Sequence, residues 1–252
     1  MRTTLILFRR EFSAFFLSPV AYIVIALVMV LNGFSFQAAM TVLETAPSEG
    51  SLVTWTFNSR WFWLFYFFIF PLITMRLFAE ERKLGTWEAL LTAPVRTSQV
   101  ILAKFGAALA FYLILWIPSA ANFFLFDAIT GGATELPPGA LFGSYLVIFL
   151  MGLFHVAIGC FASALTSNQI VAAITCFTLC LVHFLVGMFA VYLGQGMTIE
   201  FGEFYFYFAT VEHIRTFTSG LIDTRPMVYY VTFTLLFLAF THQVLEYRRW
   251  KV

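Results

Sequence analysis

The chain has 252 residues, of which 61% are hydrophobic and only 11% are charged. Soluble domains carry roughly 25% charged residues, so this composition excludes an ordinary soluble protein and indicates an integral membrane protein. The 33 phenylalanines lie in long apolar runs that do not alternate with polar residues, which favours helical spans over a β-barrel. The net charge of +1 gives no reason to expect nucleic acid as a partner.

Residues 1–17 have an amphipathic pattern, with phenylalanine and leucine on one helical face and Arg9 and Arg10 on the other. A helix of this kind lies flat at a membrane surface, with its arginines toward anionic lipid head groups. We therefore expect an interfacial helix here, ended by Ser18 and Pro19.

Six apolar stretches follow, each long enough to cross a bilayer as a helix. The predicted spans cover residues 20–40, 61–78, 101–126, 141–165, 170–193 and 228–245. Between them, residues 41–60 and 127–140 are predicted to be loops, and residues 194–227 are predicted to form short helices at the interface.

The expected fold is therefore all-α and integral to the membrane, with a single domain over residues 1–252. Its parts are an interfacial helix (1–17), a six-helix bundle (20–245) and a tail (246–252).

Several single residues add detail to the spans. Trp61, Trp63 and Trp250 lie where an aromatic belt would mark the membrane interface. Pro71 predicts a kink in the second span. Lys104 lies near the start of the third span, from which its side chain can reach the head groups.

The distribution of basic residues predicts the orientation. Eleven of the 14 basic residues lie in the N-terminal segment, in the region from Arg76 to Lys104 and in the C-terminal tail. The other three are Arg60, Arg215 and Arg225. Because basic residues concentrate on the cytoplasmic side, we expect both termini in the cytoplasm and the chain in a bacterial inner membrane.

The most polar part of the chain is residues 71–97, between two apolar stretches, and we call it the island segment. Its charged residues are Arg76, Glu80, Glu81, Arg82, Lys83, Glu88 and Arg96. Because a charge at the bilayer centre costs several kcal/mol, this segment must lie outside the hydrocarbon.

Within this segment we expect a helix leaving the membrane, a turn at Gly85 and a short second helix over residues 87–93. The apolar residues of the second helix share one face, Thr86 can cap its N-terminus and Glu88 complements its dipole. A surface helix of this kind can be bound by a soluble partner. The plainer interpretation is that the charges only stabilise a helix end, through ion pairs at helical spacing such as Arg76 with Glu80.

The chain lacks several motifs that would indicate other functions. It has no G-x-x-x-x-G-K-[ST] run, so it does not bind nucleotide through a P-loop of its own. No Asp or Glu lies in the middle of a predicted span, which counts against a proton-driven transporter that uses a carboxylate relay.

The histidines and cysteines leave an alternative open. His155 and His183 lie at similar depths on adjacent predicted spans, close enough for bis-histidine haem ligation, although hydrogen bonding within the bundle is the commoner role. Cys176 and Cys180, one helical turn apart, could ligate a soft metal, but small residues for helix packing are the more common interpretation. No metal site is predicted.

Three stretches carry a resemblance to a known family. The segment RLFAEERKLGTWEALLTAPV closely resembles the region after the second span of type-2 ABC exporter permeases. The opening FRREFSAFFLSPVAYIV and the tail from HIRTFTSGLIDTRP to the C-terminus are similar to the gliding-motility (GldF-like) branch of that family. The resemblance covers essentially the whole chain.

The resemblance implies roles for particular residues. Residues 1–17 would be the elbow helix on the inner leaflet. The contact with a separate ATPase would be made by Glu80, Glu81, Arg82, Gly85, Thr86 and Glu88, and at a second place by the turn that contains Ser167 and Asn168. Short helices over residues 200–221 would close the pathway outside, with Glu203, Phe204, His213 and Phe217 as gate residues.

The resemblance also implies partners. Two ATPase subunits, which carry the ATP and Mg²⁺, would join this chain and a second permease, either an identical copy or a paralogue, with an accessory extracytoplasmic subunit as a further partner. The chain itself would hold no cofactor and no catalytic residue. Neither the substrate nor a motility role follows from the resemblance. The competing hypothesis is a non-transport membrane scaffold or a redox subunit with haem at His155 and His183, which predicts no stimulation of an ATPase.

Overall fold

The computed structural model describes residues 2–45, 50–87, 95–132, 136–194 and 206–249. Within these ranges every regular element is an α-helix, which confirms the all-α fold class. The helices are α1 (Arg2–Phe16), α2 (Pro19–Thr45), α3 (Leu52–Phe57), α4 (Arg60–Thr74), α5 (Ala79–Lys83), α7 (Thr97–Leu115), α8 (Ile117–Ile129), α9 (Pro138–Leu165), α10 (Gln169–Gly194), α12 (Thr210–Thr218) and α13 (Thr224–Arg249).

Five helical stretches of the described chain are long and apolar enough to cross a membrane, and they include α7 and α8 as one continuous span of 33 residues. The second predicted span, residues 61–78, falls on a bent pair of helical stretches, Leu52–Leu64 and Tyr66–Lys83, which meet at 59°. The number of spans is therefore five, or six if the bent pair crosses the membrane. The bend of this pair lies between Leu64 and Tyr66, whereas α4 continues through Pro71 to Thr74, so a kink at Pro71 stays a prediction.

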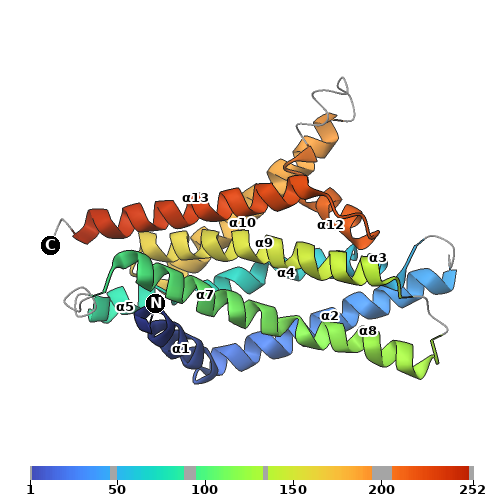
Figure 1. Ribbon diagram of the computed structural model, residues 1–252, viewed down its shortest axis with the longest axis horizontal. Coiled ribbons are helices and arrows are strands. Elements are labelled where there is room, and N and C mark those ends of the chain that lie inside the picture. The colour runs from blue at the N-terminus through green and yellow to red at the C-terminus, as the bar shows by residue number, and fades with distance from the viewer. Residues whose placement is uncertain (1, 46–49, 88–94, 133–135, 195–205, 250–252) are drawn as a thin grey trace.

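The helices run back and forth along one long axis (Figure 1). Both ends of the chain lie at the same end of the bundle as α5 and the α9–α10 turn, while α3, α12 and the end of α8 lie at the opposite end. We call these the α5 end and the α12 end. The start of α1 and the end of α13 thus lie at one end of the bundle, as an even number of spans requires, and their position on one side of the membrane stays a prediction.

The helix α9 is the centre of the bundle and contacts α13, α10, α12, α7 and α4. Its glycines allow this close approach, as small residues do between membrane helices. A Cβ atom at Gly152 would lie 2.1 Å from Cε1 of Tyr112 on α7, and one at Gly159 would lie 2.2 Å from Oγ1 of Thr74 on α4.

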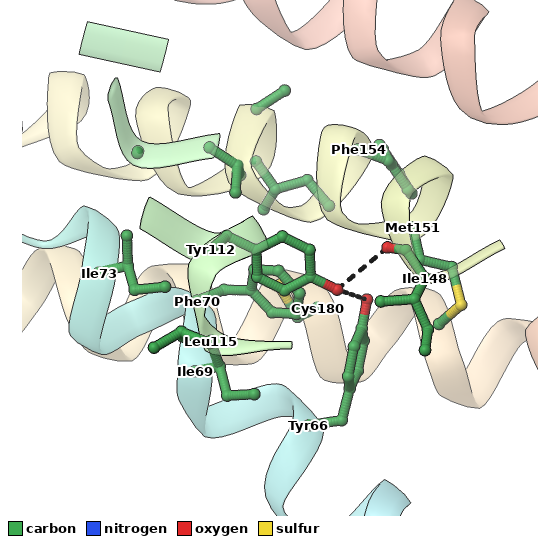
Figure 2. Packing of buried hydrophobic residues seen from close by; sticks show 14 of the residues in the cluster. Tyr66, Ile69, Phe70, Ile73, Tyr112, Leu115, Ile148, Met151, Phe154 and Cys180 are labelled. Carbon is green, nitrogen blue, oxygen red and sulfur yellow. Dashed lines mark hydrogen bonds between the residues drawn. The ribbon is translucent and has the colours of Figure 1, made fainter. Parts of the chain in front are cut away.

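The core at this crossing is aromatic (Figure 2). Tyr66, Phe70 and Tyr112 are buried together, and the Tyr112 hydroxyl donates a hydrogen bond of 3.0 Å to the carbonyl of Ile148. The two tyrosine hydroxyls are 3.4 Å apart. Each buried phenol thus finds a polar neighbour inside the apolar core, as buried tyrosines require.

The segment predicted as a polar loop over residues 41–60 is mostly helical, so that prediction is wrong. The helix α2 continues to Thr45, and the short α3 buries Leu52, Val53 and Phe57. The hydroxyl of Ser51 caps α3 by accepting a hydrogen bond of 3.2 Å from the amide of Thr54.

The loop predicted over residues 127–140 is shorter than expected, because α8 runs to Ile129 and α9 begins at Pro138. Helix α8 ends at a turn in which Gly131 and Gly132 have φ of 64° and 77°, a conformation that glycine adopts at little cost. The expected short helix in the last third of the chain is present as α12.

The packing of α9 on α4 leads to a prediction for Gly159→Ala. Thr74 is fully buried and its hydroxyl is engaged with the Phe70 carbonyl at 2.7 Å, so it cannot move away from a new methyl group at no cost. Overpacking of this kind destabilises by roughly 1–3 kcal/mol, and the melting temperature of the purified protein in detergent should fall. The control is Gly33→Ala on α2, where a Cβ would meet nothing within 4 Å. Equal melting temperatures for the two variants would contradict the packing.

Candidate functional site

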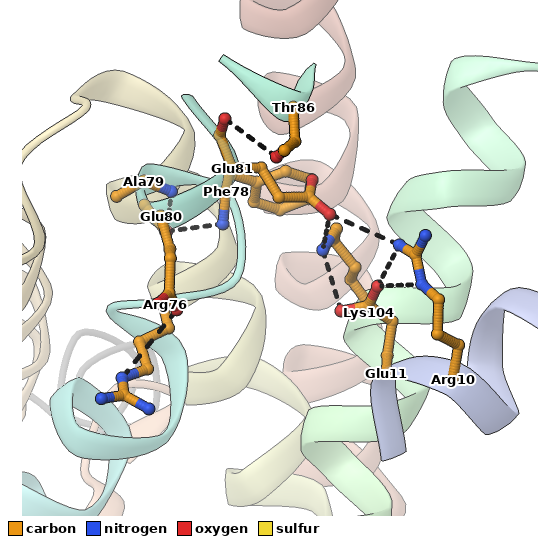
Figure 3. A network of polar contacts seen from close by, with 10 residues as sticks. Arg10, Glu11, Arg76, Phe78, Ala79, Glu80, Glu81, Thr86 and Lys104 are labelled. Carbon is orange, nitrogen blue, oxygen red and sulfur yellow. Dashed lines mark hydrogen bonds and ion pairs between the residues drawn. The ribbon is translucent and has the colours of Figure 1, made fainter. Parts of the chain in front are cut away.

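A buried lysine joins three helices at the α5 end (Figure 3). Lys104, on α7, is 2% exposed, and its Nζ lies 2.9 Å from Oε2 of Glu11 on α1 and 2.9 Å from Oε1 of Glu81 on α5. The prediction that Lys104 reaches out to the head groups is therefore wrong. A buried ammonium must be paired with opposite charge to offset its lost hydration, and the two carboxylates do this here.

Arg10 completes the cluster, and we call Arg10, Glu11, Glu81 and Lys104 the charged junction. The Arg10 guanidinium lies 3.4 Å from Oε1 of Glu81 and also pairs with Glu11. The ammonium of Lys104 is further placed 5.7 Å from the centre of the Phe78 ring, a favourable distance for a cation–π contact. Arg10, which was expected to face lipid head groups, therefore contacts Glu81 of the island segment instead.

The charges shift the pKa of Glu11. Its partial burial works to raise that pKa, but the neighbouring Lys104 ammonium and the Arg10 guanidinium outweigh burial, so the pKa of Glu11 lies below its ordinary value. The pKa of Glu11 is lower in the folded protein than in the unfolded chain. The ion pairs of Glu11 therefore add to the stability of the fold at pH values above the ordinary pKa of Glu, and this stabilisation is lost as the pH falls through the pKa of the folded protein.

A second contact ties the end of α4 to the α1–α2 turn. Arg76 Nη1 donates a hydrogen bond of 2.6 Å to the hydroxyl of Ser18, and Arg76 Nε lies 4.0 Å from Oε2 of Glu80. The predicted pair of Arg76 with Glu80 is therefore present, as a loose ion pair between half-exposed side chains.

The opposite side of α5 is held by α9. The hydroxyl of Ser163 accepts hydrogen bonds from the amides of Phe78 and Ala79 at 3.0 and 3.1 Å and donates to the Met75 carbonyl at 3.2 Å. Arg82 Nη1 donates to the carbonyl of Ala164 at 3.0 Å. The backbone groups left free where α4 breaks are thus satisfied by α9, so α5 has a fixed position.

The segment that projects beyond these contacts is residues 83–86, which we call the tip. All four residues are exposed, and Gly85 has φ of 72°, so the predicted turn there is confirmed. The hydroxyl of Thr86 donates to the carbonyl of Glu81 at 3.2 Å. Leu84 is 67% exposed and was missed in the sequence, where a leucine beside charged residues gave no sign that it faces outward.

The second helix of the island begins with helical backbone at Thr86 and Trp87. Trp87 is buried against Phe78, with ring centroids 6.0 Å apart. Glu88 and the rest of the predicted helix over residues 87–93 lie outside the described residues.

The α9–α10 turn lies beside α5 at the same end (Figure 1). Ser167 and Asn168 are exposed there. The side-chain oxygen of Asn168 accepts a hydrogen bond of 2.9 Å from the amide of Ile170, which caps the start of α10. Arg248, from the end of α13, donates to the carbonyl of Leu165 at 2.6 Å, so the turn is fixed from two sides.

The remaining expected interface residues differ in their surroundings. Arg9 is exposed, and Trp61 is 43% exposed and stacks on Phe34. Trp63 is partly buried and its ring packs on Phe184 of α10, at 5.1 Å between centroids. Trp250 lies outside the described residues.

At the α12 end, α12 packs directly on α9 and α3. His213 and Phe217 are buried, and a Cβ at Gly143 of α9 would lie 2.2 Å from the carbonyl oxygen of Phe217. From α3, the Thr54 hydroxyl donates to the Thr218 carbonyl at 3.0 Å. The other two expected gate residues, Glu203 and Phe204, lie outside the described residues.

His213 is held by two hydrogen-bond partners, the Tyr230 hydroxyl at 2.9 Å from Nδ1 and the Phe206 carbonyl at 3.0 Å from Nε2. Burial lowers its pKa to about 4. The imidazole is therefore neutral at neutral pH, so Nε2 carries the proton that the carbonyl accepts, and Nδ1 accepts from the tyrosine.

The histidine pair expected for haem ligation is packed in another way. The rings of His155 and His183 are in edge-to-face contact with centroids 5.2 Å apart, while His155 Nδ1 lies 2.8 Å from the Met151 carbonyl and His183 Nε2 lies 2.9 Å from the Tyr229 hydroxyl. A haem ligated by both would have to lie between the rings, and their contact leaves no room for it. The redox alternative is therefore not supported.

The cysteines also pack inside the bundle. Cys160, Cys176 and Cys180 are free and buried. In the part of the chain that the structure describes, no group of three or more His, Cys, Asp or Glu side chains is placed to hold a metal ion.

The part of the chain that matches a known protein family includes this site. A sequence profile described as ABC-2 family transporter protein matches residues 8–187. The match begins within α1 and ends within α10, so it includes the charged junction, the tip and the α9–α10 turn. A search of curated proteins gave no match.

The charged junction predicts an asymmetric response to substitution. Lys104→Met leaves the carboxylates of Glu11 and Glu81 buried without their main partner, and breaking a buried ion pair in this way costs about 3–5 kcal/mol. Replacing all three, as Lys104→Met with Glu11→Gln and Glu81→Gln, removes the unpaired charges and should recover most of that loss.

The measurement is the free energy of unfolding in detergent, with the exposed Lys83→Met as the control, expected to change it by less than about 0.5 kcal/mol. A Lys104→Met variant as stable as Lys83→Met would show that the junction does not hold these helices together.

Proposed function

Because the chain belongs to the ABC-2 family of transporter proteins, as a membrane permease component, we propose that it couples ATP hydrolysis by a separate ATPase subunit to export of a substrate across the bacterial inner membrane. Permeases of this family pair with an ATPase subunit, and the permease domain itself lacks ATPase motifs. The observation that carries the coupling proposal is the exposed tip, projecting from an α5 that is fixed on two sides.

The tip can transmit a displacement caused by the ATPase, because α5, from which the tip projects, is fixed in position. On one side Glu81 joins the charged junction with α1 and α7. On the other side Arg82 and the backbone at Phe78 are bonded to α9. A movement of the tip is therefore passed to α1, α7 and α9 at once, since packed helices transmit displacement with little compression.

The residues of the expected coupling region therefore have two different roles in this proposal. Glu80, Glu81 and Arg82 position the segment, whereas Gly85, Thr86 and the residues that follow, including Glu88, face the ATPase. Substituting Glu81 would therefore change both folding stability and coupling. A substitution at Leu84 would change coupling without changing folding stability, because this side chain is exposed and contributes little to the fold.

The turn with Ser167 and Asn168 supplies the second contact in this proposal. It is exposed, capped and adjacent to α5 at the same end of the bundle. Two fixed contacts on neighbouring helices allow an ATPase to rotate the bundle rather than only tilt one helix.

At the far end, we assign closure of the pathway to α12 and α3. Helix α12 packs directly on Gly143 of α9, and α3 is joined to α12 by the hydrogen bond from Thr54 to Thr218. Both are thus connected to α9, the same helix that holds α5. His213, Phe217 and, on the neighbouring segment, Glu203 and Phe204 are the proposed gate residues.

The proposed assembly holds two ATPase subunits and two permeases, the second a copy or a paralogue, in the inner membrane. ATP and Mg²⁺ are bound by the ATPases. An accessory extracytoplasmic subunit and membership of the gliding-motility branch are further parts of this proposal, supported by the similarity of the opening, island and tail sequences.

The first prediction here concerns orientation, which the distribution of basic residues supports. Cysteine placed at the exposed Lys83 should react with a membrane-impermeant thiol reagent only when the cytoplasmic face is accessible, and cysteine at the exposed Leu221 only from outside. The native cysteines are buried, so background labelling should be low. Labelling of Lys83→Cys on intact cells would reverse the orientation and remove the coupling proposal.

The second prediction concerns the tip. Leu84→Ser should reduce retention of the ATPase on the immobilised permease by roughly tenfold, because fully burying a leucine at an interface is worth about 1.5–3 kcal/mol. The melting temperature of the permease alone should not change. Leu221→Ser is the matched control, since Leu221 is also 67% exposed but lies at the α12 end. Full ATPase retention by Leu84→Ser would exclude the tip as the contact.

A further inference from the structure

A cavity of about 460 Å³ lies between the elbow helix and the spans at the α5 end. Its walls come from α1, α2, α4, α5 and α7. One part of the wall is apolar and is formed by residues such as Phe15, Val20, Val24, Leu72 and Phe111. A cavity of this size is within the range of about 300–1,000 Å³ that is typical of ligand sites.

One side of the cavity is charged. It presents three cationic and three anionic side chains: Arg10, Arg76, Lys104, Glu11, Glu80 and Glu81. The formal charge of this lining is zero, although its polarity is high. Such a lining disfavours a ligand with a net charge and favours one that carries both signs, because each ligand charge then meets an opposite one.

Two charged side chains on this lining are partly exposed. Arg76 and Glu80 are 37% and 41% exposed and form a loose ion pair, with Nε 4.0 Å from Oε2. Glu81, in contrast, is engaged through Oε1 in the charged junction, as Figure 3 shows. Because exposed ion pairs contribute little to stability, a ligand that supplies both charges can replace the contact between Arg76 and Glu80.

We propose that this cavity binds the head group of a zwitterionic aminophospholipid, with a phosphoethanolamine group, as a resident lipid. The phosphate accepts from the Arg76 guanidinium, the ammonium donates to the Glu80 carboxylate, and the acyl chains lie against the apolar wall. A phosphocholine lipid lacks the N–H that the carboxylate needs, and an anionic phosphatidylglycerol brings no cation for Glu80. The inference requires that the chain spans a membrane and does not depend on coupling to an ATPase.

The test is native mass spectrometry of the purified chain in detergent, with phosphatidylethanolamine, phosphatidylcholine and phosphatidylglycerol added in equal amounts. We expect one tightly bound phosphatidylethanolamine, retained roughly tenfold more than either competitor, as one charge-assisted hydrogen bond would give. Soluble glycerophosphoethanolamine should not displace it, because it lacks acyl chains for the apolar wall. Displacement by the soluble compound would instead assign the site to a free phosphoethanolamine ligand and overturn the lipid assignment.

Two variants distinguish recognition from folding. Arg76→Gln should lose the bound lipid, whereas Arg60→Gln, an exposed arginine at the other end of α4, should keep it. Glu80→Gln makes the lining net positive and should shift the preference toward phosphatidylglycerol, a change of selectivity that loss of structure would not produce. Equal retention of the three lipids by the unmodified chain, or an unchanged preference in Glu80→Gln, would overturn the proposal.

Discussion

The burial of one ammonium group, that of Lys104, constrains the whole α5 end of the protein. With 2% of its side chain exposed, the charge must be neutralised by groups within the fold, and Glu11 and Glu81 are the groups that reach it. Because one is on α1 and the other on α5, the interfacial helix and the island segment are held in fixed positions relative to α7. An apolar residue at position 104 would impose no such arrangement.

The second constraint is the close packing of α9. Glycines along α9 allow α4, α7 and α12 to approach its backbone, and Ser163 supplies the hydrogen bonds that the break between α4 and α5 requires. Helix α9 therefore contacts α12 at one end of the bundle and the break between α4 and α5 at the other. In the proposed coupling mechanism, a movement of the tip would reach α12 through α9.

The sequence was sufficient for the features that depend on local pattern. Long apolar runs, the amphipathic first helix and the turn at Gly85 each follow from a few neighbouring residues. It was insufficient for features that depend on distant partners: Lys104 and Glu11 are 93 residues apart, and a lysine at the edge of an apolar run is locally indistinguishable from one that reaches the head groups. The helix α3 was missed because six residues are too few for a span and resemble a loop.

The sequence was also insufficient to assign inward and outward side chains within the island segment. Its charge predicts a segment outside the hydrocarbon, but α5 has only five residues, too few for a helical period to separate inward from outward side chains. Only the structure places Glu81 inward, in the charged junction, and Leu84 outward, at the tip.

The central claim is that Lys104 holds α1 and α5 together as one unit, and amide hydrogen exchange tests it most directly. In the unmodified protein, α1 and α5 should exchange slowly. In Lys104→Met both should exchange faster and by a similar factor, because both lose the same anchor, while α9 keeps its protection. Unchanged exchange in α1 and α5, or faster exchange in only one of them, would contradict the claim.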